Sequence, residues 1–69
     1  MIAAQCRVGR ALLNMTVKEL AAATVVATDT LVRFESGAEL KPRTVDAIKE
    51  ALEAAGGEFL PDGGVRLRQ

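Results

Sequence analysis

Histidine, tryptophan and tyrosine are absent from this sequence, and cysteine occurs once, at Cys6. Without histidine, the chain lacks the most common protein ligand for metals and the most common general base. Cys6 has no partner base and falls on the apolar face of an expected helix, so we interpret it as a core thiol. No set of residues suited to catalysis is left. We therefore expect a protein that is not an enzyme and that holds no cofactor or metal.

Two further absences bear on where the protein works. A single cysteine cannot close a disulfide within the chain, which fits a reducing cytoplasm. The longest mainly apolar run, residues 20–27, is far shorter than the roughly 20 residues that span a bilayer. Residues 1–5 also lack the charged start of a signal peptide. The expectation is a cytoplasmic protein without a membrane partner.

Aromatic residues are scarce, because only Phe34 and Phe59 occur although 49% of the residues are hydrophobic. The core must therefore be aliphatic and rich in alanine, which favours helices that pack closely. With 69 residues, the chain makes one domain near the lower limit of independent stability. Dimerisation would stabilise a domain of this size.

Nine basic and nine acidic residues give a net charge of zero, which is unusual for a protein that binds nucleic acid. The two signs are unevenly distributed along the chain. Residues 1–45 carry six basic and four acidic residues, whereas residues 46–62 carry one basic and five acidic residues. Such a chain can present a basic face to DNA and turn an acidic helix away from it.

Apolar residues spaced three and four apart predict four helices, at residues 2–13, 17–24, 27–35 and 43–55. The first helix is expected to bury one stripe, made of Ile2, Cys6, Gly9 and Leu13. Asn14 and Gly37 follow two of the helices at points where a left-handed residue is expected. Thr16 and Glu19 form a capping-box pattern in front of the second helix.

Residues 58–69 contain two short segments, 58–60 and 65–68, on either side of the turn signal Pro61-Asp62-Gly63-Gly64. These segments are predicted to form a short strand or a hairpin. The predicted fold class is thus mainly α, with a helical domain at residues 1–57 and a short β tail at residues 58–69.

Residues 20–35 are predicted to form two short helices joined by a tight turn. This stretch resembles the helix-turn-helix of the Cro/repressor (Xre-like) family, whose pattern runs Leu-Ala-x-x-x-Gly-Val-Ser-x-x-Thr-Ile-x-x-hydrophobic-Glu. The matching positions are Leu20-Ala21, Val26, Thr30-Leu31, Phe34 and Glu35. The resemblance covers residues 5–55 well and the tail moderately. It implies a four-helix, lambda-repressor-like DNA-binding domain.

In proteins of this kind the third helix enters the major groove, and residues near its N-terminus meet the base edges. The resemblance therefore assigns base readout to Thr28, Asp29, Thr30 and Arg33. Phosphate contacts are expected from helix N-termini and nearby basic side chains, at Thr16, Lys18, Lys41, Arg43 and Thr44. Without the resemblance, the same residues would be ordinary solvent-exposed polar side chains.

Three positions depart from the family pattern. Val25 stands where glycine usually provides a positive φ, and a β-branched residue in that conformation is strained by roughly 1–2 kcal/mol. Ala27 replaces the serine that would cap the third helix. Either the turn has a different geometry, or Thr28 caps a helix that begins one residue later. Val17 replaces a polar residue that often contacts a phosphate.

Arg10 and Glu35 match a pair that is common in this fold, an arginine in the first helix and the glutamate that ends the third. If the pair is partly buried, it fixes the third helix instead of contacting DNA. Removing one partner should then cost several kcal/mol, because the other charge is stranded. The alternative is two solvated charges.

The tail is the candidate dimerisation element, because its apolar residues leave surface that a small domain struggles to cover: Phe59, Leu60, Val65 and Leu67. An exposed strand can pair with its copy across a two-fold axis. The alternative is a hairpin that folds back onto its own helices.

The sequence thus predicts a bacterial or phage transcriptional regulator, most simply a repressor. It is expected to insert helix 27–35 into the major groove of operator DNA as a homodimer. The alternative is a protein–protein interaction module on the same fold, such as an adaptor or an antitoxin-like partner, which the zero net charge and Asp29 favour.

Overall fold

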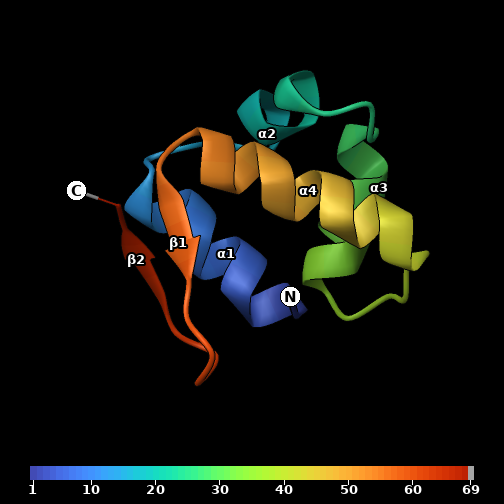
Figure 1. Cartoon of the computed structure of the whole chain (residues 1–69). Coiled ribbons are helices and arrows are strands. Elements are labelled where there is room, and N and C mark those ends of the chain that lie inside the picture. The colour runs from blue at the N-terminus through green and yellow to red at the C-terminus, as the bar shows by residue number, and fades with distance from the viewer. Residues whose placement is uncertain (69) are drawn as a thin grey trace.

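The computed structural model describes residues 1–68, which form four helices followed by a β-hairpin (Figure 1). The elements are α1 (Ala3–Leu12), α2 (Val17–Ala23), α3 (Thr28–Glu35), α4 (Pro42–Ala54), β1 (Gly57–Phe59) and β2 (Val65–Leu67). This confirms the prediction of a mainly helical fold with a small β element at its C-terminal end. In Figure 1, α3 and the hairpin lie on opposite sides of the molecule, with α1 and α4 between them.

Several element boundaries differ slightly from the predicted ones. Helix α4 begins at Pro42, because proline suits the first helical turn, where no backbone N–H is needed. Strand β1 begins at Gly57, so residue 57 belongs to the hairpin and not to the helical part. Ile2 was expected on the buried stripe, but it lies outside α1 as its N-cap and is 63% exposed.

Helix α1 ends in a Schellman motif built on Asn14, which has a φ of 56°. The N–H of Met15 donates to the carbonyl of Arg10 (2.9 Å), and the N–H of Asn14 donates to that of Ala11 (3.1 Å). Gly37, with a φ of 107°, ends α3 in the same way. Both left-handed residues occupy the positions expected for them.

The core is aliphatic, as the composition requires, and each helix contributes to it. Leu20, Leu31, Ile48 and Leu52 are fully buried, and Phe34 is the aromatic residue among them. Among residues 1–68, the buried hydrophobic residues are Cys6, Leu20, Val26, Leu31, Phe34, Ile48 and Leu52. Because this core lies between α3 and the remaining helices, it fixes the inner face of α3 and leaves its outer face free.

The hairpin pairs β1 with β2 in antiparallel register, with Glu58 opposite Arg66 and Phe59 opposite Val65. It folds back onto the helices of its own chain: β1 contacts α4, and β2 contacts α1. Phe59 packs against the core, and Lys49 of α4 lies over its ring, 5.7 Å from the centroid. Of the two arrangements left open by the sequence, the structure shows the hairpin folded on its own helices.

Candidate nucleic-acid interface

Helix α3 has two chemically different faces. Leu31 and Phe34 are buried in the core. The exposed side chains on its outer face are Thr28, Asp29, Val32 and Arg33. Three of the four residues predicted to read bases are therefore presented to solvent on one short helix. A helix whose inner face is buried and whose outer face is mostly polar can enter a groove about as wide as a helix.

Thr30, the fourth predicted base reader, is partly buried instead of pointing outward. Its side of α3 turns toward the N-terminal half of α4. There it helps to line a hollow together with Val25, Val26, Ala27, Arg43, Thr44 and Ala47. The hollow thus joins one predicted base reader to two of the predicted phosphate contacts.

The turn between α2 and α3 has a geometry different from the one that glycine would require. Val25 does not have a positive φ, since Asn14 is the only non-glycine residue among residues 1–68 that does. The hydroxyl of Thr24 holds the turn: it donates to the carbonyl of Ala21 (3.2 Å) and accepts from the N–H of Val26 (2.9 Å). Val25 is left 99% exposed.

The N-terminus of α3 has no side-chain cap. Ala27 is the N-cap residue, and Thr28 is already the first residue of the helix. The possibility that Thr28 caps a helix beginning one residue later is therefore wrong. The helix therefore starts with N–H groups that its own N-cap side chain does not satisfy.

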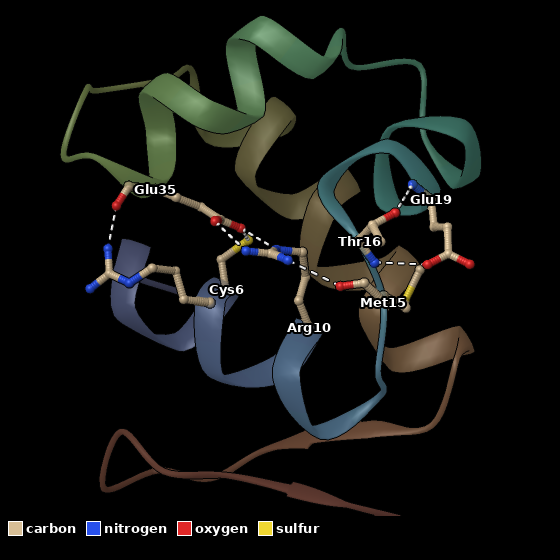
Figure 2. Close-up of polar contacts among 7 residues, drawn as sticks. Cys6, Arg10, Met15, Thr16, Glu19 and Glu35 are labelled. Carbon is tan, nitrogen blue, oxygen red and sulfur yellow. Dashed lines mark hydrogen bonds and ion pairs between the residues drawn. The ribbon is translucent and has the colours of Figure 1, made fainter.

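Arg10 and Glu35 form an ion pair that joins α1 to the end of α3 (Figure 2). The Arg10 Nε donates to Glu35 Oε2 and the Nη2 donates to Oε1, each at 2.7 Å. Both side chains are largely shielded from solvent, with 20% of Arg10 and 8% of Glu35 exposed. Arg10 Nη1 also donates to the Met15 carbonyl (3.0 Å), which ties the same guanidinium to the segment in front of α2.

Two further contacts to Glu35 could not be anticipated from the sequence. The Cys6 thiol donates to Glu35 Oε2 (3.1 Å), and Arg7 donates to the Glu35 backbone carbonyl. Periodicity places Cys6 in the core, but it does not reveal a carboxylate 29 residues further along the chain. The buried thiol is therefore part of a polar network, whereas the sequence predicted a purely apolar environment.

The charges in this network shift one another's pKa values. Burial, followed by the hydrogen bond to Glu35, raises the pKa of the Cys6 thiol to about 12. Burial alone would raise the pKa of Glu35, but the hydrogen bonds from Arg10 and Cys6 outweigh it and lower that pKa. The hydrogen bond to Glu35 raises the pKa of Arg10. The network therefore holds one carboxylate and one guanidinium charged beside a neutral thiol.

The predicted phosphate contacts fall at two places. Thr16 and Lys18 lie at the start of α2, where Thr16 Oγ1 accepts from the Glu19 N–H (3.0 Å) and Glu19 Oε1 accepts from the Thr16 N–H (2.8 Å). Lys41 is the N-cap residue of α4, and Arg43 and Thr44 lie in its first turn. Within residues 1–68, the two ion pairs of the structure leave Lys41, Arg43 and Arg33 unpaired.

The residues predicted to mediate dimerisation differ in solvent exposure. Phe59, Leu60 and Val65 are partly buried against their own chain. Leu67 is 46% exposed. Most of the apolar surface expected on the tail is therefore already covered by α1 and α4.

None of the helices in the described part of the chain is long and apolar enough to cross a membrane. Residues 1–68 also contain no group of three or more His, Cys, Asp or Glu side chains able to hold a metal ion. Neither a scan against protein-family models nor a search of curated proteins finds a match to this chain. Its function is therefore inferred from the site itself.

Proposed function

We propose that this protein is a sequence-specific DNA-binding regulator of transcription, most simply a cytoplasmic repressor of bacterial or phage type. The proposed fold is a lambda-repressor-like domain in which α2 and α3 form the helix-turn-helix of the Cro/repressor family. In this arrangement α3 enters the major groove, and the N-termini of α2 and α4 approach the phosphates on either side.

The observation that carries the proposal is that α3 is fixed in position by contacts on its inner face and at its last residue. Its inner face is fixed by Leu31 and Phe34, and its last residue, Glu35, is bound by side chains from α1. The outer face is polar except for Val32, which is 49% exposed. A helix whose position is fixed from behind by a buried ion pair is well suited to present side chains in a defined register to base edges.

The three polar residues of the outer face have chemistry that fits this role. Arg33 can donate two hydrogen bonds to guanine, Thr28 can donate or accept, and Asp29 can accept from the cytosine amino group. The unpaired cations Lys41 and Arg43 lie at the start of α4, and Arg43 lines the hollow together with Thr30 of α3. They supply the sequence-independent attraction to phosphates that a chain of zero net charge otherwise lacks.

An adaptor function has specific observations in its favour. Val25 is a fully exposed apolar side chain beside a hollow whose wall includes Val26 and Ala47, and Asp29 would be repelled by phosphates. A protein partner could cover this apolar surface, as in interaction modules generally.

Binding to random-sequence duplex DNA, measured by fluorescence anisotropy at low and high salt, separates the two functions. A DNA-binding protein should bind at low salt and weaken steeply as salt rises, because counterions are released. An adaptor should show no binding to the duplex at either salt concentration, and that result would refute the DNA-binding proposal. If binding is seen, selection of sites from a random DNA library should then return an enriched sequence with two-fold symmetry.

A further inference from the structure

The hollow between α3 and the start of α4 combines an apolar wall with a cationic one. Its volume is about 400 Å³, which falls within the roughly 300–1,000 Å³ typical of ligand sites. Among residues 1–68, its apolar wall is formed by Val25, Val26, Ala27 and Ala47, and its polar wall by Thr30, Arg43 and Thr44. No acidic residue of this part of the chain lines it. The hollow therefore offers apolar surface and a positive charge to the same occupant.

Val25 is the most exposed large apolar residue of residues 1–68, and it lines this hollow. It is 99% exposed, whereas the adjacent Val26 is 8% exposed. The apolar wall thus runs from a buried side chain to one that lies almost wholly in water. Because the hydroxyl of Thr24 holds this turn through two hydrogen bonds, the fold itself presents Val25 to solvent. A partner that covers Val25 removes apolar surface from water, which favours binding.

Arg43 gives the hollow a positive charge that the described part of the chain leaves unneutralised. Neither of the two ion pairs found within residues 1–68 involves Arg43. The hollow also lies at the start of two helices, since Ala27 is the N-cap residue of α3 and Thr44 lies in the first turn of α4. The N-terminal end of a helix carries a partial positive charge. An anionic group is therefore the electrostatic complement of the polar wall.

A phosphate group or a small carboxylate complements only part of this surface. Arg43 and Thr44 can bind phosphate oxygens, but a phosphate has no apolar surface to cover Val26 or Ala47. A small aliphatic carboxylate that fits inside the hollow leaves Val25 in water, because that side chain is exposed on almost all sides. A segment of protein chain complements the whole surface. It can place an aliphatic side chain in the hollow and continue across Val25.

We propose that this hollow docks an acidic segment of a partner protein, in which an aliphatic residue lies within a few positions of an Asp or Glu. The aliphatic side chain packs against Val26 and Ala47, and the neighbouring backbone covers Val25. The carboxylate accepts charge-assisted hydrogen bonds from Arg43. Recognition by one buried apolar anchor and one charged contact is common among peptide-binding sites.

Two acidic residues restrict where the negative charge of the partner can lie. Asp29 and Asp46 are exposed on α3 and α4, and neither lines the hollow. A carboxylate beside Arg43 meets a positive charge, whereas carboxylates placed further along either helix meet a negative one. The site therefore favours a segment with a single acidic position in register with Arg43 over a uniformly acidic chain.

The docking site overlaps the residues assigned to DNA. Thr30 is a proposed base reader, Arg43 and Thr44 are proposed phosphate contacts, and all three line the hollow. A partner seated there excludes DNA from these residues, so it releases the protein from its operator. This regulatory consequence rests on the proposed function, whereas the docking of the acidic segment does not.

Selection from a random dodecapeptide library displayed on phage tests the proposal on the full chain. Wild type should enrich sequences that join an aliphatic residue to Asp or Glu. An enriched peptide is then synthesised, and its dissociation constant is measured by isothermal titration calorimetry. Val25→Ser and Arg43→Gln should each raise this constant by about tenfold or more, because each removes one of the two main contacts.

The matched controls make the same chemical changes away from the hollow. Val8→Ser replaces another exposed valine, on α1, and Arg66→Gln removes an exposed arginine on the hairpin. Neither should change the dissociation constant. Circular dichroism verifies that each variant is folded. Isocaproate, which carries an aliphatic group and a carboxylate without a peptide chain, should bind far more weakly than the peptide.

Several results would overturn the docking site. These are a library that enriches no sequence, enriched sequences without Asp or Glu, and a dissociation constant that Val25→Ser or Arg43→Gln leaves unchanged. Isocaproate that binds as tightly as the peptide would make the occupant a small carboxylate instead of a protein segment.

Fluorescence anisotropy with labelled random-sequence duplex tests the regulatory consequence. At low salt the peptide should displace the DNA, and DNA that stays bound at saturating peptide would overturn the exclusion. A protein that binds the peptide but no DNA would refute only the proposed function. A protein that binds DNA but no peptide would refute only the docking site.

Discussion

Arg10 of α1 binds both carboxylate oxygens of Glu35, the last residue of α3, through two hydrogen bonds of 2.7 Å. The two residues are 25 positions apart, and their pairing fixes the end of the helix that carries the candidate base readers. The Cys6 thiol donates to the same carboxylate, so one acidic group joins two residues of α1 to α3. The network has a structural role, since none of these three side chains lies on the outer face of α3.

Removing one partner of this pair should therefore act on stability. Glu35→Ala and Arg10→Ala should each lower the free energy of unfolding by about 3 kcal/mol, because each leaves a shielded charge without its partner. The double substitution should cost clearly less than the sum of the two. Urea denaturation of the four proteins measures this coupling. Additive effects would mean that the two charges are stabilised by solvent instead of by each other.

The same pair predicts how stability depends on pH. The pKa of Glu35 is lower in the folded chain than in the unfolded chain, where it is about 4.3. The ionised carboxylate therefore contributes to the free energy of unfolding above that unfolded pKa. This contribution is lost as the pH falls through the lower pKa of the folded state. Unfolding free energies measured from neutral pH downward should show wild type and Glu35→Gln converging below about pH 4. Glu58→Gln is the control: its ion pair is exposed, and the difference should stay small at every pH.

The elements and several contacts of this fold could be predicted from the sequence because they depend on local signals. The spacing of apolar residues gives the four helices, Asn14 and Gly37 mark two helix ends, and Thr16 with Glu19 forms the capping box. Each of these depends on residues at most four positions apart. The Arg10–Glu35 pair was expected only through the family resemblance.

The exposure of Thr30, the hydrogen bond of Cys6 and the geometry of the turn could not be predicted. Each depends on tertiary contacts between elements that are distant in the sequence or on their relative orientation. Whether Thr30 faces solvent or α4 is decided by the rotation of α3 in the folded chain. The hydrogen bond of Cys6 joins residues 29 positions apart and leaves no periodic trace. Of the two alternatives left open for the turn at Val25, the structure shows the different geometry, which depends on the hydrogen bonds that Thr24 offers.

Cys6 should be chemically inert in the folded protein. Its pKa is raised to about 12 and its side chain is fully buried, so almost no accessible thiolate exists at pH 8. A chromogenic disulfide reagent should react at once with the urea-unfolded chain and only at the rate of unfolding with the native chain. Rapid reaction under native conditions would show that α1 separates from α3 far more often than the buried network allows.

The stability of the turn between α2 and α3 should depend on the hydroxyl of Thr24. Thr24→Val removes both hydrogen bonds of the hydroxyl at nearly constant volume, and we expect it to lower the free energy of unfolding by about 1–2 kcal/mol. Val25→Gly should not stabilise the protein, because there is no positive φ for glycine to relieve. Thermal and urea unfolding of the two variants measure the contrast. A stabilised Val25→Gly protein would show that the turn is strained after all.

The last prediction separates base readers from phosphate contacts once a preferred site is known. Arg33→Ala should relax the preference at one or two base positions and cost roughly 1–3 kcal/mol on the best site. Lys41→Ala and Arg43→Ala should instead weaken binding to all sequences about equally. Each of these two should flatten the log–log salt dependence by about one unit, since each phosphate contact releases about 0.9 counterion.

Arg10→Ala is the structural control, because Arg10 binds Glu35 and lies away from the outer face of α3. It should lower the melting temperature while leaving the preferred sequence unchanged. Binding isotherms on the preferred and a scrambled duplex, each at several salt concentrations, measure all four variants. If Arg33→Ala kept its site preference but showed a shallower salt slope, Arg33 would be a phosphate contact. Base reading would then fall to Thr28 and Asp29, the remaining exposed polar side chains at the start of α3.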